Sequence, residues 1–315
     1  MKKKILITGG AGFIGSNVAD AYLADGNEVV VVDDLSSGSL ENLDSRVKFY
    51  QLNICSPALE EIFARERPDI VNHHAAQISV PYSIENPIND AEINLKGFLN
   101  VLQCSVKHGV KKVILISSGG AIYGEAKEYP ATENCPLNPL SIYAIHKMTS
   151  EYYVRFYRYQ YNLNYTILRY ANVYGPRQIA QSEAGVVSIF IENLLHNQAP
   201  MLYLYPEEPE GMIRDYVYVK DVVRANVAAL DKGDNDVFNI GTGQETTTSF
   251  LYKTIAWQLG TDIQPIPGPA RKGDLRRSLL DCSKAFKELG WSPVYTLDAG
   301  IRETIEFFKN KESLK

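Results

Sequence analysis

The sequence predicts an α/β fold in which a doubly wound parallel sheet is followed by a smaller α/β domain. The chain opens with a short apolar run, Ile5 to Ile7, which stops at glycines and is followed by apolar residues at helical spacing. Segments with strand and helix patterns then alternate through the first half. Beyond Asn172 this rhythm becomes irregular and prolines are frequent, which indicates that a smaller domain begins there.

Three glycines, Gly9, Gly12 and Gly15, follow the first expected strand. In such a strand–turn–helix unit, Gly9 permits a tight turn, Gly12 lets a pyrophosphate approach the backbone, and Gly15 lets the helix pack on the strand. The free N–H groups and the dipole at the helix N-terminus favour a phosphate pair. The spacing G-x-x-G-x-x-G by itself is also compatible with an ordinary turn between a strand and a helix.

The second half of the unit supports nucleotide binding. Residues 28–34 have the pattern of a second strand ending in carboxylates, and Asp33 stands 18 positions after Gly15. An acid at this place meets the ribose hydroxyls of NAD and repels the additional phosphate of NADP. The sequence therefore predicts a Rossmann-type domain that binds NAD.

The alternation continues to the middle of the chain. The expected strands are 47–52, 69–74, 112–118 and 165–170, and the expected helices are 58–65, 88–108 and 142–161. We expect an NAD-binding domain over 1–172 and a substrate domain over 173–315, partly interleaved, with a strand near 237–240 as a candidate to return to the main sheet. Substrate should lie between the two halves, beyond the carboxyl ends of the strands.

Composition excludes several classes of function. The 315 residues are 45% hydrophobic and 22% charged, which is typical of a soluble globular protein. The formal net charge of -5 gives no support to nucleic-acid or membrane binding. Glycines interrupt the apolar run after Lys2, Lys3 and Lys4 too early for a signal peptide, and no apolar stretch has the length of a membrane span.

The four cysteines are scattered, with no C-x-x-C pair. This pattern implies neither a disulfide framework nor a metal site, and it is typical of reduced thiols in a cytoplasmic protein.

A chemical motif, Y-x-x-x-K, begins the expected helix 142–161. It places Tyr143 and Lys147 one turn apart on one face, where the ammonium should lower the phenol's pKa from about 10 toward the working range. Bound NAD+ adds a second positive charge, and the resulting base can take a proton from an alcohol as hydride leaves the same carbon. Ser118, which ends a strand, is placed to hydrogen-bond the reacting oxygen. The alternative is a surface tyrosine and lysine without a catalytic role.

Seven segments taken together resemble the extended short-chain dehydrogenase/reductase superfamily: TGGAGFIGS, VVDDLSSG, HHAAQ, SSGGAIYGE, YAIHK, RYANVYGPRQ and RDYVYVKD. Within it the chain is similar to the NDP-sugar epimerase/dehydratase family, and most to UDP-glucose (UDP-galactose) 4-epimerases. The resemblance extends from about Lys4 to Phe308. It implies that Tyr143 is the acid/base, that Lys147 holds the nicotinamide ribose, and that Ser118 binds the sugar's 4-oxygen.

The resemblance also implies two sets of binding residues. The NAD contacts would be Gly9, Gly12, Phe13, Ile14, Gly15, Asp33, Asn53, Ile54, Ala75, Ala76, Asn94, Tyr143 and Lys147. The UDP-sugar contacts would be Ser118, Tyr143, Asn172, Val187, Arg214, Arg271, Asp274 and Ser278. Paired arginines suit a diphosphate because guanidinium binds phosphate oxygens in a fork.

Three departures from the family pattern stand out. Asn53 occupies a position where an aspartate is usual, and the loop 205–211 looks longer and more acidic than usual. The segment after the serines appears one residue longer, so one alignment places Gly119 at the active-site serine position. We prefer Ser118, because Gly119 has no side chain with which to act, and Ser117 is a lesser candidate.

The residues after Ser118 indicate which reaction to expect. Dehydratases of this family carry an acid there, because elimination of water needs its own acid and base, and a decarboxylase would also need an added acid and arginine. Here Gly119, Gly120, Ala121 and Ile122 follow, and none can move a proton. We therefore expect 4-epimerisation of a UDP-hexose through a transient 4-keto sugar. The alternatives are another NDP-sugar dehydratase or reductase and, more remotely, a non-catalytic NAD or nucleotide-sugar sensor.

Two finer expectations concern assembly and substrate. Tyr152, Phe156 and Tyr159 lie about 160–220° around the expected helix from Tyr143, so this stripe should face away from the cleft and form a homodimer, unless another helix covers it. At Ser278 some related epimerases carry a tyrosine that excludes N-acetyl groups. The small serine predicts that UDP-galactose and UDP-N-acetylgalactosamine both react.

Overall fold

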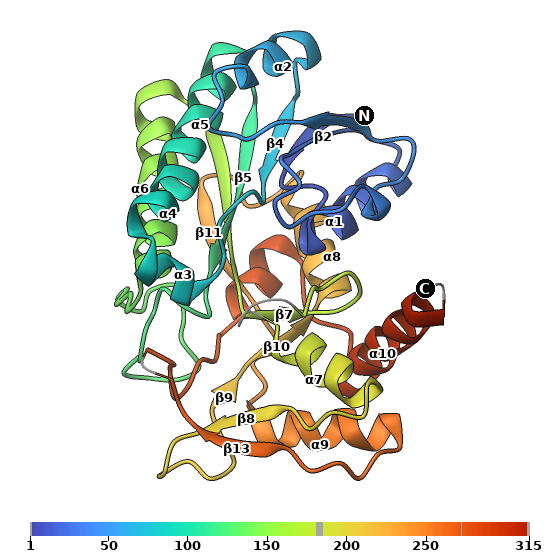
Figure 1. The fold of residues 1–315 in the computed structure, drawn as a ribbon. Coiled ribbons are helices and arrows are strands. Elements are labelled where there is room, and N and C mark those ends of the chain that lie inside the picture. The colour runs from blue at the N-terminus through green and yellow to red at the C-terminus, as the bar shows by residue number, and fades with distance from the viewer. Residues whose placement is uncertain (1, 181–184, 272, 314–315) are drawn as a thin grey trace.

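A seven-stranded parallel sheet forms the centre of the computed structural model, which describes residues 2–180, 185–271 and 273–313. The strand order is β3-β2-β1-β4-β5-β6-β11 (Figure 1). These strands are β1 (Lys4–Thr8), β2 (Glu28–Asp33), β3 (Lys48–Gln51), β4 (Ile70–His73), β5 (Lys112–Ser118), β6 (Asn164–Tyr170) and β11 (Asp236–Ile240). Successive strands run parallel because helices connect them, as in a doubly wound fold.

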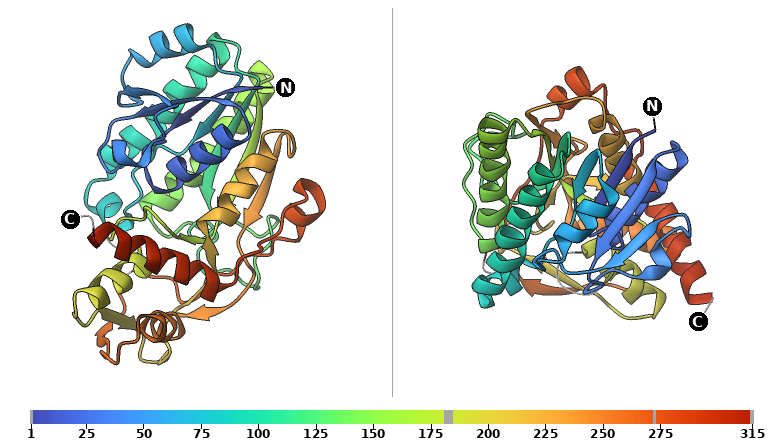
Figure 2. Two further views of the ribbon diagram at one scale, coloured as in Figure 1. Left: turned by 90° about the vertical axis from the view of Figure 1, so that its right-hand side faces the viewer. Right: turned by 90° about the horizontal axis from the view of Figure 1, so that it is seen from above.

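Helices cover both faces of this sheet, as Figures 1 and 2 show. One face packs against α1 (Phe13–Ala24) and α8 (Val219–Ala229), and the other against α2 (Leu59–Glu66), α5 (Phe98–Lys107) and α6 (Ile142–Tyr161). Strand β1 is buried on both faces, since Ile5 and Ile7 belong to one core cluster and Leu6 to the other. This explains its continuous apolar run.

The second half of the chain forms a smaller unit below the sheet in Figure 1. Its strands pair in twos: β7 (Asn172–Tyr174) with β10 (Tyr216–Tyr218), β8 (Met201–Leu204) with β13 (Ile266–Pro269), and β9 (Ile213–Arg214) with β12 (Thr246–Thr247). Its helices are α7 (Val186–Leu195), α9 (Thr248–Leu259) and α10 (Leu297–Ser313). A separate apolar cluster joins these helices, while β11 and α8 belong to the main sheet and its cover. The boundary at 172/173 stays a prediction.

The helix expected over 88–108 is present over 87–107, but its backbone widens in the middle. The structure has α3 (Val80–Glu85), α4 (Pro87–Ala91), the wide π-turn η2 (Glu92–Gly97) and then α5. Asn94 lies in the wide turn, and its side chain bonds the backbone of Gln77 instead of pointing outward. The long helix expected over 88–108 is therefore present, and the π-turn within it was not expected from the sequence.

The remaining short elements are η1 (Leu40–Asn42) and η3 (Ala285–Leu289). Among the residues that the structure describes, no helix has the length and apolar character needed to cross a membrane.

Candidate active site

The glycine turn lies where the strand order reverses, between β1 and β4. Ligands of doubly wound sheets bind at such a switch point. Gly9 has φ +69°, and its N–H donates to the carbonyl of Val32 at 2.9 Å. A Cβ at Gly9 would lie 2.5 Å from the backbone nitrogen of Ala75, so only glycine fits between the first and fourth strands.

Gly12 and Gly15 meet different constraints at the start of α1. A Cβ at Gly15 would lie 2.3 Å from the carbonyl oxygen of Gly9, so the fold itself requires glycine there. Gly12 is the N-cap of α1, with φ -76° and no side-chain cap, and a Cβ there would meet only the Gly9 oxygen at 3.3 Å. The open backbone at Gly12 and the first turn with Phe13 and Ile14 fit the approach of a pyrophosphate.

Asp33, at the end of β2, supports the glycine turn. Its carboxylate accepts hydrogen bonds from the backbone N–H of Ala11 at 2.9 Å and of Leu35 at 2.8 Å. Burial raises the pKa of this carboxyl group. Each oxygen can accept further bonds, so contact with a ribose hydroxyl is compatible with this arrangement.

The other expected cofactor residues follow neighbouring strands. Asn53, after β3, donates from Nδ2 to Asp34 at 2.8 Å and accepts from the Cys55 N–H at 2.8 Å. Ile54 is buried, and Ala75 and Ala76 are half-buried in the segment that follows β4.

Ser118, Tyr143 and Lys147 come together at the carboxyl end of β5. Ser118 ends this strand beside Tyr143 in the first turn of α6, and its hydroxyl group acts to lower the pKa of the phenol. Lys147 Nζ lies 5.8 Å from the centre of the Tyr143 ring and donates to the carbonyl of Ile116 at 3.0 Å. Ser117 instead donates to Glu151 within the core, which makes Ser118 the serine beside the phenol.

The pKa of Tyr143 differs from the sequence-based expectation. Burial is the main reason that its pKa is raised to about 12; Ser118 acts in the opposite direction, and the Asp90 carboxylate adds to the rise. Burial also lowers the pKa of Lys147 to about 8. The expectation of a lowered phenol pKa was wrong for the protein alone, because desolvation by burial is the largest effect on this group.

A pair of expected substrate residues flanks the segment after Ser118. A Cβ at Gly120 would lie 3.5 Å from Asn172 Oδ1 and 4.0 Å from Ser278 Oγ, so these side chains converge there. Asn172 Oδ1 is buried and has no hydrogen-bond partner among the described residues. A buried acceptor of this kind is available to a ligand.

The remaining expected substrate residues lie in the smaller unit. Arg271 stacks on the Tyr203 ring at 4.6 Å and bonds Asp274 through Nε at 3.4 Å. Arg214 is half-buried and donates to the carbonyl of its neighbour at 3.0 Å. The side chain of Val187 belongs to the core of this unit.

Residues 5–241 match the NAD dependent epimerase/dehydratase family. The chain belongs to this family. It is 44% identical to the UDP-glucose 4-epimerase of Mycolicibacterium smegmatis over 314 residues, which cover 98% of this chain and 99% of that relative.

Solved structures agree with this assignment. UDP-glucose 4-epimerase from Thermotoga maritima, crystallised with UDP-glucose, is 48% identical with a TM-score of 0.95 and covers 99% of this chain and 100% of its own. The Thermus thermophilus UDP-glucose 4-epimerase in complex with NAD is 42% identical with a TM-score of 0.94, covering 97% of this chain and 99% of its own.

A buried polar cluster beside the phenol of this epimerase-family protein was missed from the sequence. Asp90 is fully buried and accepts from Asn94 Nδ2 at 3.0 Å and from Gln77 Nε2 at 2.5 Å, and it also pairs with His146. Its carboxylate acts on the pKa of Lys147, raising it against the effect of burial. The one indication of this cluster in the sequence was His146, which directly precedes Lys147 in Y-A-I-H-K.

The acidic loop 205–211 contacts the segment that carries Asp274. Tyr205 Oη donates to the Asp274 carbonyl at 2.5 Å, and Glu207 pairs with Arg276 at 3.3 Å. Glu125 is exposed, as expected, and its carboxylate accepts from the Arg276 N–H at 2.5 Å.

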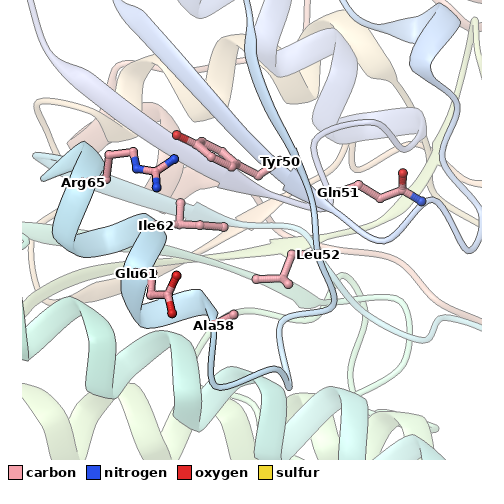
Figure 3. Close-up of a pocket in the computed structure, with 7 residues that line it drawn as sticks. All are labelled: Tyr50, Gln51, Leu52, Ala58, Glu61, Ile62 and Arg65. Atoms are coloured by element: carbon pink, nitrogen blue, oxygen red, sulfur yellow. The ribbon is translucent and has the colours of Figure 1, made fainter.

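A cavity of about 210 Å³ lies between β3 and α2, outside this site (Figure 3). Its lining residues are Tyr50, Gln51, Leu52, Ala58, Glu61, Ile62 and Arg65. None of them is a candidate site residue, so the cavity plays no part in the chemistry considered below.

Proposed function

We propose that this protein interconverts UDP-hexoses at carbon 4, with NAD as a resident cofactor. The observation that carries the proposal is the group of Ser118, Tyr143 and Lys147 at the switch point of an NAD-binding sheet, followed by residues that cannot move a proton. Relatives covering the whole chain, solved with UDP-glucose and with NAD, support the assignment.

The side chains divide the chemistry among them. NAD+, when bound, accepts hydride from sugar carbon 4 and later returns it. Tyr143 takes the proton from the 4-hydroxyl group and gives it back to the same oxygen after the 4-keto sugar has turned over. Ser118 holds that oxygen by a hydrogen bond, and Lys147 supplies the positive charge that favours the phenolate.

The polar groups farther along the site would hold the nucleotide. Arg214 and Arg271 suit the diphosphate, Asp274 the uridine ribose, and Asn172 the phosphate region. Gly9, Gly12, Gly15 and the N-terminus of α1 would hold the NAD pyrophosphate.

The dehydratase alternative requires an additional acid and base beside the sugar. Glu125 is the nearest acid in sequence after Ser118, and its carboxylate is exposed and engaged by the Arg276 N–H and by Tyr129. This arrangement favours epimerisation over elimination of water.

The test is to incubate purified protein with UDP-galactose and no added NAD. We expect UDP-glucose to form without net NADH and without the absorbance of an unsaturated sugar. Tyr143→Phe should retain NAD and its fold but lose roughly 10²–10⁴-fold in turnover, because the general acid/base is absent. Net NADH production or an unsaturated product would favour a reductase or dehydratase, and near-normal turnover by the variant would overturn the role of Tyr143.

We also propose that two copies associate through the outer face of α6. Tyr152, Phe156 and Tyr159 are 63%, 50% and 86% exposed, and no part of the chain that the structure describes covers them. α6 is the outermost helix on its side of the sheet (Figure 1). An aromatic stripe of this size is typical of an association surface, and two-fold symmetry is the commonest way to bury one.

Two further proposals concern substrate breadth and location. The small, buried Ser278 beside Gly120 supports a pocket wide enough for an acetamido group as well as a hydroxyl.

Four free cysteines, Cys55, Cys104, Cys135 and Cys282, support a cytoplasmic location.

A further inference from the structure

Three contacts join the end of strand β5 to one face of helix α6. Three consecutive positions at the end of β5, 116–118, contact three α6 residues spaced one turn apart. The carbonyl at 116 accepts from Lys147 Nζ at 3.0 Å, and Ser117 Oγ donates to Glu151 Oε1 at 2.6 Å. The hydroxyl group at 118 lies beside Tyr143 and acts on its pKa. The spacing i, i+4, i+8 places Tyr143, Lys147 and Glu151 on one face of the helix.

The contact between Ser117 and Glu151 is fixed by a buried ion pair. Arg169 on β6 binds the Glu151 carboxylate in a fork, through Nε at 2.9 Å and Nη2 at 2.6 Å. Glu151 is 2% exposed, and Arg169 and Ser117 are each 3% exposed. A buried pair contributes little net stability because desolvation offsets its attraction, but its forked geometry allows only one relative placement of the two elements.

The same arginine also reaches the chain on the other side of Ser118. Its Nη1 donates to Tyr123 Oη at 2.7 Å, and Tyr123 Oη in turn donates to Asn239 Oδ1 on β11 at 2.8 Å. The Tyr123 hydroxyl group therefore contacts the arginine of the ion pair, but its hydrogen bonds go to Arg169 and Asn239 and not to Ser117 or Glu151.

We propose that Glu151 is a positioning residue, which acts through Ser117 to hold the Ser118 hydroxyl in register with the Tyr143 phenol at the reacting oxygen. This inference rests on the proposed function, since it assigns those two groups to the proton transfer. Misplacement of a reacting group by about 1 Å can cost about 100-fold in rate. The Ser117 hydroxyl group is hydrogen-bonded to the ion pair and belongs to the residue directly before Ser118. Its loss can therefore displace Ser118 and lower turnover.

The experiment compares two variants that each delete one hydroxyl group from the same network. Ser117→Ala removes the link to Glu151 but leaves the ion pair complete. We expect kcat for UDP-galactose to fall about 10- to 100-fold, with KM and retained NAD unchanged. Tyr123→Phe is the matched control, because it removes a hydroxyl on the far side of Arg169, and we expect kcat within about two-fold of wild type at a similar loss of thermal stability.

The pH profile provides a readout that a purely structural role would not move. The Ser118 hydroxyl group acts to lower the pKa of Tyr143, so displacing it should raise that pKa. The acid limb of the kcat profile should therefore move to higher pH in Ser117→Ala and stay in place in Tyr123→Phe. Glu151→Gln, if it is recovered folded, should move the limb in the same direction.

Equal kcat values for Ser117→Ala and wild type would overturn the inference. So would a loss of kcat in both variants that follows their thermal stability, with an unchanged pH profile. If wild type itself does not convert UDP-galactose, the proposed function fails instead, and the two failures are therefore distinguishable.

Discussion

At Lys147, burial and a neighbouring charge have opposite effects on the pKa of the side chain. Burial lowers its pKa to about 8, while Asp90 acts in the opposite direction. In an unfolded chain a lysine titrates near 10.4, so between about pH 8 and about pH 10.4 the unfolded state binds more protons. The stability contribution of Lys147 therefore rises with pH across this window, by at most about 1.4 kcal/mol per pH unit.

This linkage gives a prediction for Lys147→Met. The variant has no buried ammonium, so it should be more stable than wild type near pH 7, and the difference should narrow toward pH 10. Urea unfolding of both proteins at several pH values measures the free energies. A difference that stays constant with pH would contradict the lowered pKa.

Ser278 sets the second prediction at this scale. Wild type should convert both UDP-galactose and UDP-N-acetylgalactosamine. Ser278→Tyr should lower kcat/KM for the N-acetyl sugar more than for UDP-galactose, because the tyrosine ring fills space beside Gly120. Ser283→Tyr, at an exposed serine five positions later, is the control and should leave the ratio unchanged. The prediction fails if wild type rejects the N-acetyl sugar or if Ser278→Tyr leaves the ratio unaltered.

Motif spacing predicted the residues of the proton-transfer group, but not their surroundings. Ser118, Tyr143 and Lys147 follow from the end of a strand and one helical turn. Glu151 continues the same four-residue spacing and could have been noticed, whereas its partner Arg169 stands 18 residues later on another strand. The raised pKa of Tyr143 could not be predicted, because desolvation depends on the packing of the whole site.

At the scale of elements, two glycines of the turn after β1 have different roles: the fold requires Gly15, whereas Gly12 is needed for NAD binding. Gly15→Ala introduces a Cβ 2.3 Å from the Gly9 oxygen and should cost about 1–3 kcal/mol in stability as well as NAD binding. Gly12→Ala meets only a 3.3 Å contact, so it should fold with a nearly normal Tm yet purify with little NAD. Thermal unfolding and the NAD content of the purified proteins measure these effects. Full NAD content in Gly12→Ala would contradict the assigned pyrophosphate site.

The strongest local patterns gave the correct elements. The strand over 112–118 and the helix over 142–161 have the bounds expected from periodicity, since each is apolar on the faces that it buries. The region 88–108 differs because Asn94 bonds Gln77 and Asp90, and the backbone widens into a π-turn there. Periodicity reports the buried face of a helix, but not a side chain that is drawn toward a neighbouring segment.

At the scale of the whole molecule, the exposed stripe on α6 predicts a dimer. Phe156→Glu combined with Tyr159→Glu should convert it to a monomer at micromolar concentration, because burying two carboxylates at an apolar interface is unfavourable. Trp257→Glu, which alters a 76% exposed aromatic residue on α9, is the control and should leave the dimer intact. Light scattering measures the mass. A monomeric wild type would refute the proposed interface.

The α/β class and the parallel sheet could be predicted because alternating strands and helices leave few topologies open. The pairing of β11 with β6 is less evident from local pattern, since 65 residues separate Tyr170 from Asp236 and much of the smaller unit lies between them. The arrangement of Asn172, Ser278 and Gly120 likewise depends on how the two halves of the chain pack.

The central claim is that hydride leaves carbon 4 of the sugar and returns to the same carbon. UDP-galactose that carries deuterium at carbon 4 tests this claim when it is converted in ordinary water and the product is examined by NMR and mass spectrometry. We predict that UDP-glucose retains the deuterium at carbon 4, since Tyr143 exchanges only the hydroxyl proton. Loss of the label to solvent, or its appearance at another carbon, would contradict the account.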